Sequence, residues 1–301
     1  MVNFILLCVC FVLGLAIRMA GIVDEKGPAA LNAVVIYMSM PALALLYAHS
    51  LPMGVELIFP AAMGWIVFAI GYVFFTVLGK IFDWDEKTVV CLTLCVGLGN
   101  TSFVGLPMIE TFFGQQYIGI GMLCDTGGSF LALAIPGIIL AAKVSGAEVN
   151  GPMVAKKVLL FPPFLAVVLG IALQPVTYPD WVTGVLTRLG STLSPLALLS
   201  VGMTLSVNSL RGHTRELLWG LGYKLVLAPL IILLLYMVVL GKTDVVTRVT
   251  VFEAAMGPMV TGGIIAMSHG VKSSLAVALV GVGTVVSFAT LPAWYAVIQL
   301  F

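Results

Sequence analysis

Two short stretches of this chain carry groups that could bind a polar ligand inside an apolar surrounding. The stretch GNTSFVGLP, residues 99–107, combines two glycines, an asparagine, two hydroxyl side chains and a proline, and AAMGPMVTGG, residues 254–263, also contains glycine and proline. Unwinding a helix there would expose N–H groups at one half-helix start, where the helix dipole favours an anion, and C=O groups at the other half-helix end. We therefore expect a ligand site, with a packing kink as the alternative. The candidate residues are Asn100, Thr101, Ser102, Pro107, Gly257, Pro258 and Thr261.

Three ionisable residues also stand inside apolar runs, namely Asp125, Lys224 and Glu253. A charge at the centre of a bilayer costs about 2.5–3.5 kcal/mol on insertion scales, so such a residue usually faces protein or water. Two interpretations stay open for them. The residues either form a structural ion pair that holds the fifth, eighth and ninth predicted spans together, or they serve proton coupling or the recognition of an anionic substrate by Lys224.

The composition indicates lipid as the main solvent of the chain. Of 301 residues, 61% are hydrophobic and 9% charged, whereas about a quarter are charged in a soluble domain. The net charge of +1 gives no reason to expect a nucleic-acid partner. The five cysteines lie in apolar runs without CxxC spacing, so we expect no disulfide, metal or cofactor. The chain has no Walker A loop, HExxH or GxSxG motif, which argues against an ATP-driven pump and an intramembrane enzyme.

Charge and turn clusters divide the chain into ten apolar segments, most of them 20 or more residues long, which is enough to span about 30 Å of hydrocarbon. We therefore predict an all-α polytopic membrane protein with ten transmembrane helices. The first segment lacks a basic start and is expected to be a retained helix. The predicted spans are 2–19, 29–49, 57–78, 88–113, 118–142, 155–174, 182–206, 217–240, 246–268 and 273–300.

The basic residues predict the orientation, because cytoplasmic loops carry an excess of lysine and arginine. Both termini are expected outside, in the periplasm of a cell with an inner membrane. The cytoplasmic side then receives Arg18, Lys26, Lys80, Lys87, Lys143, Lys156, Lys157, Arg211, Arg215 and Lys272, and the opposite side only Arg188, Lys242 and Arg248.

A weak internal repeat relates the two halves of the chain. SMPALALL (39–46) resembles LSPLALLS (193–200), IGYVFF (70–75) resembles LGYKLV (221–226), and SFLALAIP (129–136) resembles SFATLP (287–292). A repeat of five spans must be inverted, because five is an odd number. The two glycine- and proline-containing stretches then fall in matching spans, four and nine, which is the best sequence indication of a transporter's binding site.

These motifs resemble the auxin efflux carrier family, which includes bacterial permeases and is related to PIN-type auxin carriers. The resemblance covers essentially the whole chain. It implies a fold like that of bile-acid sodium symporters, with repeats at 1–142 and 155–301 joined by a cytoplasmic linker at 143–154. Spans one, two, six and seven would form a scaffold. Spans three to five and eight to ten would form a transport domain in which broken helices four and nine cross.

The resemblance further implies a secondary transporter of a small organic anion, such as a carboxylate, that works by an elevator-like motion. It assigns substrate binding to Asn100, whereas span nine has no matching asparagine, so a symmetric pair of asparagine contacts is not expected. The alternatives are a sodium-coupled symporter or a cation/proton antiporter of similar fold, and a passive channel. The expected partners are the anion and the lipid bilayer. Proton or sodium coupling and a homodimer are left open.

Overall fold

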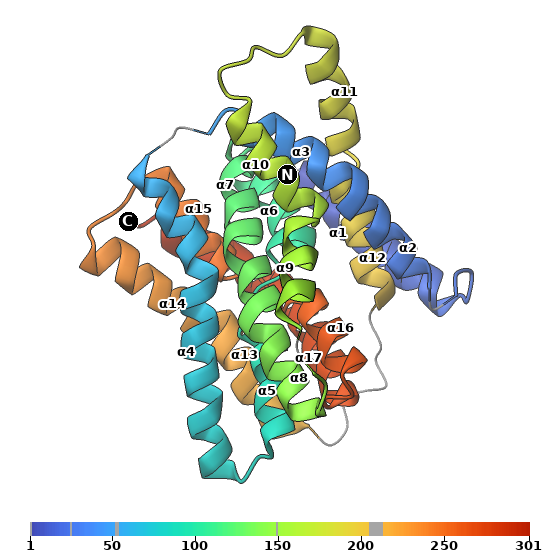
Figure 1. Cartoon of the computed structure of the whole chain (residues 1–301), viewed down its shortest axis with the longest axis vertical. Coiled ribbons are helices and arrows are strands. Elements are labelled where there is room, and N and C mark those ends of the chain that lie inside the picture. The colour runs from blue at the N-terminus through green and yellow to red at the C-terminus, as the bar shows by residue number, and fades with distance from the viewer. Residues whose placement is uncertain (1, 25, 52–53, 149, 205–212) are drawn as a thin grey trace.

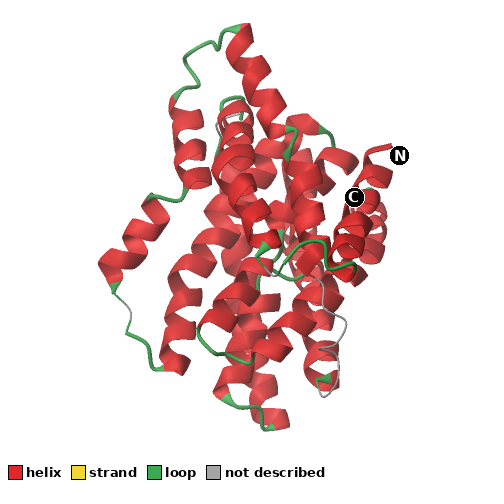
Figure 2. Cartoon of the chain, turned by 90° about the vertical axis from the view of Figure 1, so that its right-hand side faces the viewer, coloured by secondary structure: helices red, strands yellow, loops and turns green. Residues whose placement is uncertain are grey.

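The computed structural model describes residues 2–24, 26–51, 54–148, 150–204 and 213–301. Within these residues every regular element is a helix and no strand is present, as Figure 2 shows. The all-α prediction is confirmed for this part of the chain. Arg211, which the orientation argument used, and residues 205–206 at the end of the seventh predicted span lie outside the described residues.

The first half of the chain forms long helices with short π-helical and 3₁₀ turns between them. The elements are α1 (Val2–Met19), α2 (Gly27–Val34), η1 (Val35–Ser39), α3 (Met40–Ala48), η2 (Val55–Leu57), α4 (Ile58–Phe82), α5 (Glu86–Val96), η3 (Thr101–Gly105), α6 (Leu106–Phe112), η4 (Gln115–Tyr117), α7 (Ile118–Leu123), η5 (Cys124–Phe130), η6 (Leu133–Gly137) and α8 (Ile138–Ser145).

The second half has a similar organisation. Its elements are α9 (Gly151–Leu159), α10 (Pro162–Ala172), α11 (Asp180–Gly190), α12 (Leu193–Thr204), α13 (Thr214–Gly222), η8 (Tyr223–Leu227), α14 (Ala228–Leu233), η9 (Leu234–Val239), α15 (Val245–Ala254), α16 (Val260–Ser268) and α17 (Ser273–Ile298). Each predicted span coincides with one of these helices or with a consecutive group of them.

Six continuous helical stretches among the described residues are long and apolar enough to cross a membrane. They are Gly27–Ala48, Val55–Phe82, Gln115–Ser145, Asp180–Thr204, Thr214–Val239 and Ser273–Ile298. The first and sixth predicted spans correspond to shorter apolar helices, Ile5–Met19 and Pro162–Ala172. The fourth and ninth are interrupted. The protein is therefore a polytopic membrane protein, and the ten-span inverted repeat stays a prediction.

The helices pack in two groups around a buried centre. In one group α1 runs along α12 and α3 runs along α10; in the other α4 contacts η5 and α5, and α5 contacts α16 and α17. Helix α5 is buried over Thr88–Val96, on all of its faces, so it lies at the centre of the second group. Figure 1 shows α1, α2, α3 and α12 together on the right, away from α4 and α14.

The end of the molecule at the α4–α5 turn gathers several residues that the sequence places in the cytoplasm. Lys143 near the end of α8 forms an ion pair of 2.9 Å with Glu86, the first residue of α5. Helix α8 ends where Gly146 adopts φ +73°, a conformation that favours glycine, so helix extends into the predicted linker. Both marked chain ends lie in the upper half of Figure 1, opposite this turn.

Candidate substrate site at two interrupted helices

The first interruption separates α5 from η3 at residues 97–100, so it overlaps the stretch 99–107 at Gly99 and Asn100 and begins two residues before it. Asp85 caps the start of α5 by accepting a hydrogen bond of 2.9 Å from the Thr88 N–H. Asn100 restarts the helix in the same way, because its Oδ1 accepts from the Phe103 N–H at 3.2 Å. The unwound part is thus shorter than the polar stretch, and Pro107 lies buried in the first turn of α6.

The second interruption separates α15 from α16 at residues 255–259. Asp244 caps α15 by accepting from the Thr247 N–H at 3.0 Å, as Asp85 does for α5. Pro258 has no N–H to continue a helix, and α16 begins two residues later. The second interruption therefore lies within the stretch 254–263, whereas the first overlaps only the start of the stretch 99–107.

The two interruptions hydrogen-bond to each other. The Asn100 N–H donates to the Gly257 carbonyl at 2.9 Å, and the Met259 N–H donates to the Cys95 carbonyl at 2.8 Å. An isolated antiparallel bridge joins Gly99 to Pro258. Backbone groups freed from a helix at membrane depth need partners within the protein, and here each broken segment supplies them for the other. Part of the unwound backbone is thus already paired.

Asp125 lies at the restart of the first broken helix. The Thr101 hydroxyl donates to Asp125 Oδ1 at 2.7 Å, and these two side chains are only 1% and 2% exposed. Because Thr101 is the first residue of η3, the acid stands at the end of the helix where the backbone dipole favours a negative charge.

Lys224 lies at the opposite kind of helix end. Its Nζ donates to the carbonyl of Ala254, the last residue of α15, at 2.9 Å. No ion pair within 4 Å joins Lys224 to Asp125 or Glu253 among the described residues. The ion pair that the sequence left open is absent there, because the ammonium binds a carbonyl at the negative end of a helix dipole instead.

Glu253 is fully buried, and neither of its carboxyl oxygens has a hydrogen-bond partner among the described residues. The carboxyl group packs against Gly105, since a Cβ there would lie 2.5 and 2.6 Å from its two oxygens. Gly105 therefore makes room for an acid that sits between the two broken helices. The three charges expected from the sequence thus lie around the interruptions, each in a different environment.

A cavity of about 300 Å³ opens beside these interruptions. Its polar lining consists of Ser102, Asp125, Thr261 and Ser268, and its apolar lining includes Phe103, Phe130 and Met259. The cavity also touches Ile36 and Met40 of the second predicted span and Phe161 before α10. Of the candidate residues, Ser102, Thr261 and Asp125 line it. The remaining candidates, Asn100, Thr101, Pro107, Gly257, Pro258, Lys224 and Glu253, are buried but do not line it.

The side-chain amide of Asn100 is 2% exposed, and its Nδ2 has no hydrogen-bond partner among the described residues. An amide nitrogen brings two N–H donors, and leaving such a group buried without a partner costs about 1–3 kcal/mol. Asn100 is thus a buried donor with unused capacity where the two interruptions hydrogen-bond to each other.

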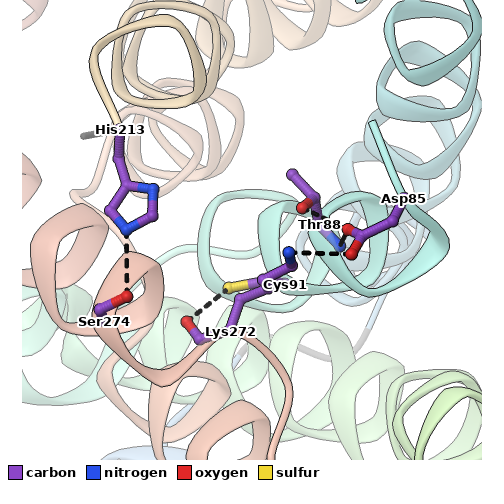
Figure 3. A network of polar contacts seen from close by, with 6 residues as sticks. All are labelled: Asp85, Thr88, Cys91, His213, Lys272 and Ser274. Carbon is purple, nitrogen blue, oxygen red and sulfur yellow. Dashed lines mark hydrogen bonds and ion pairs between the residues drawn. The ribbon is translucent and has the colours of Figure 1, made fainter. Parts of the chain in front are cut away.

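Polar contacts that the sequence did not predict join the first turns of α5 to Lys272, the residue before α17 (Figure 3). Lys272 Nζ pairs with Asp85 Oδ2 at 2.8 Å. The Cys91 thiol donates to the Lys272 carbonyl at 3.7 Å, and His213 Nε2 lies 3.0 Å from Ser274 Oγ.

Burial alone would raise the pKa of the Asp85 carboxyl. The ion pair with Lys272 and the hydrogen bonds from Thr88 outweigh it and hold that pKa below its ordinary value. These polar contacts tie the start of α5 to the start of α17.

Comparison with known proteins gives a family and two relatives. The profile of a family described as membrane transport protein matches residues 1–295. An uncharacterized transporter of Methanothermobacter thermautotrophicus is 25% identical over 293 residues, which cover 96% of this chain and 95% of that protein. An uncharacterized transporter of Methanocaldococcus jannaschii is 25% identical over 203 residues, which cover 64% of this chain and 65% of that protein.

Proposed function

The chain belongs to the membrane transport protein family, the auxin efflux carrier family that its motifs resemble, and we propose that it is a secondary transporter of a small organic anion. The family and the names of the relatives indicate a transporter rather than an enzyme. The cargo we propose is a carboxylate, carried across the cytoplasmic membrane by an elevator-like alternating-access motion. The basic-residue distribution supports an orientation with both termini outside.

The observation that carries the proposal is the cavity beside the interruptions. Its volume of about 300 Å³ suits a small ligand. Thr261 is the second residue of α16, so the cavity meets a helix start whose first N–H groups have no partner within the helix. Those groups, the helix dipole and the hydroxyls of Ser102 and Thr261 all favour an anion.

The position of the cavity supports the elevator-like motion. One wall comes from Ile36, Met40 and Phe161, which belong to the proposed scaffold, and the rest comes from the proposed transport domain. The scaffold division is supported by the packing of α1 on α12 and of α3 on α10. A ligand held at such a boundary would change its access to either side if one group moved against the other.

We assign Asn100 a substrate contact on the strength of its unused donor. Pro107, Gly257 and Pro258 shape the backbone around the site, and Thr101 holds Asp125. Substrate reaches Asn100 only if the cavity extends toward the crossing point in another state of the transport cycle.

A cation/proton antiporter is the second candidate, because Asp125 lines the same cavity and would favour a cation. Two unit negative charges about 4 Å apart repel by about 4 kcal/mol at an effective dielectric constant of 20, which lowers affinity about a thousandfold. An anion would therefore bind together with a proton on Asp125. Proton coupling of anion transport follows from the proposal.

The test is the thermal stability of the purified protein with mono- and dicarboxylates, since a ligand of the folded state raises its unfolding temperature. We expect stabilisation by a carboxylate, about tenfold weaker affinity in Thr261→Val and Asn100→Ala, and no change in Thr183→Val, a matched control on the exposed side of α11. Stabilisation by inorganic cations alone would favour the antiporter. Unchanged carboxylate affinity in Thr261→Val would remove the cavity from the proposal.

A further inference from the structure

Lys224 points inward because of a local change in helix geometry. The repeat aligns Lys224 with Val73, and Val73 in the regular helix α4 is 62% exposed, whereas Lys224 is 1% exposed. Lys224 lies in the π-helical turn η8, which follows α13. A π-helical turn shifts the side chains that follow relative to an α-helix and is frequent at functional sites. This turn brings an ammonium group to the crossing point.

The ammonium completes the hydrogen bonding at the end of α15. The carbonyls of Val251 and Phe252 accept from the Ala255 N–H, and the carbonyl of Glu253 accepts from the Met256 N–H. The next carbonyl, that of Ala254, accepts from Lys224 Nζ. Lys224 thus satisfies the last carbonyl of this half-helix, where the helix dipole places about half a negative charge.

The end of α5 approaches the same ammonium. A Cβ on Gly99 would lie 3.1 Å from Lys224 Nζ and 3.5 Å from the Glu253 carbonyl oxygen. Glu253 directly precedes Ala254, whose carbonyl accepts from the ammonium, so its buried carboxyl group belongs to the same half-helix end. The positive charge therefore stands beside the C-terminal ends of both broken helices and near a buried acid.

In transporters with broken helices, unwound carbonyls and half-helix C-terminal ends coordinate the coupling sodium ion or proton. We propose that the Lys224 ammonium is the resident cation of this crossing point and takes the place that a coupling sodium ion would occupy. Transport would then be independent of sodium. Removal of the ammonium would create a site for a small inorganic cation, with the Ala254 carbonyl and the Glu253 carboxylate as ligands.

The proposal rests on the proposed transport function only for its consequence, sodium-independent transport. The cation site itself is measured on purified protein without any substrate. If the natural sequence binds carboxylates but is also stabilised by sodium, the proposed transport function stands and the proposal about Lys224 is wrong. If no carboxylate stabilises the purified protein, the proposed transport function is wrong, and the sodium measurement alone decides the proposal about Lys224.

The experiment compares unfolding temperatures in NaCl and in choline chloride at equal ionic strength. The natural sequence should unfold at the same temperature in both salts. Lys224→Ala should be less stable in choline chloride and should regain stability as NaCl rises. At a sodium concentration ten times the dissociation constant, the folding equilibrium constant increases about elevenfold.

Two further variants make the test specific. Lys224→Met fills the space with an apolar chain and should be destabilised equally in both salts. Lys80→Ala is a control at an exposed position near the end of α4, and its unfolding temperature should depend on the salt as that of the natural sequence does. If Lys224→Ala does not fold, Lys224→Gln is measured in its place. Sodium-specific stabilisation of the natural sequence overturns the proposal, and so does its absence in Lys224→Ala or, where that variant does not fold, in Lys224→Gln.

Discussion

The hydrogen bond between Thr101 and Asp125 allows a quantitative test of the site geometry. Thr101→Val keeps the shape of the side chain and deletes the hydroxyl that donates to Asp125 Oδ1 at 2.7 Å. Thr101 is nearly inaccessible to solvent and does not line the cavity that Asp125 lines, so the place of the deleted hydroxyl is not open to water. A hydrogen bond to a charged group contributes about 1.5–3 kcal/mol. We therefore expect the ratio of folded to unfolded protein to fall about 10- to 150-fold.

The assay is equilibrium unfolding of the purified protein, for Thr101→Val, Asp125→Ala and the double variant. The interaction energy of this cycle should be about as large as the loss in Thr101→Val alone, because Asp125→Ala removes the acceptor. Thr126→Val is the matched control: Thr126 is equally buried, but its hydroxyl donates to the Met122 carbonyl of its own helical segment. An interaction energy near zero for Thr101 and Asp125 would refute the assignment of Asp125 to the restart of the broken helix.

Two further predictions concern the α4–α5 end. Because the ion pair with Lys272 and the bonds from Thr88 hold the pKa of Asp85 below its ordinary value of about 3.9, its contribution to stability is present above that value and is lost as the pH falls through the lower folded-state pKa. Between pH 5 and pH 3, about two units around that value, the unfolding temperature of the natural sequence should therefore drop more than that of Asp85→Asn. Parallel pH profiles of the two proteins would contradict this prediction. A cysteine at Ser145, in a chain without its native cysteines, should resist impermeant thiol reagents applied to intact cells; rapid labelling would contradict an outside location of both termini.

Much of the helical framework could be predicted from composition and spacing. The second interruption falls inside 254–263 and the first overlaps the start of 99–107, because glycine and proline weaken helices near those points. A fourth match relates the two halves of the chain: Asp85 and Thr88 recur as Asp244 and Thr247, and each aspartate caps the first half of a broken helix. An aspartate three residues before a threonine at the start of an apolar run is a recognisable capping pattern.

The extent of the unwound segments could not be predicted. The polar stretch 99–107 suggested a long break, whereas helix resumes at Thr101, because the side chain of Asn100 caps the new helix start. The inward direction of Lys224 follows from its charge, but the group that it reaches, the carbonyl of Ala254, could not be predicted from the sequence.

The signs of the buried charges of Asp125 and Lys224 match the polarity of the helix ends beside them, and the two residues do not form an ion pair with each other. Asp125 lies at a helix start, where backbone N–H groups concentrate positive charge, and Lys224 lies at a helix end, where carbonyls concentrate negative charge. A sequence shows which residues are ionisable but not which end of a broken helix each one reaches, so it leaves an ion pair open beside proton coupling and anion recognition. Glu253 has neither arrangement, since both of its oxygens lack hydrogen-bond partners in the described chain. It is therefore the acid that would respond most strongly to a change of charge at Lys224, and sodium binding in a neutral Lys224 variant should weaken in the double variant with Glu253→Gln.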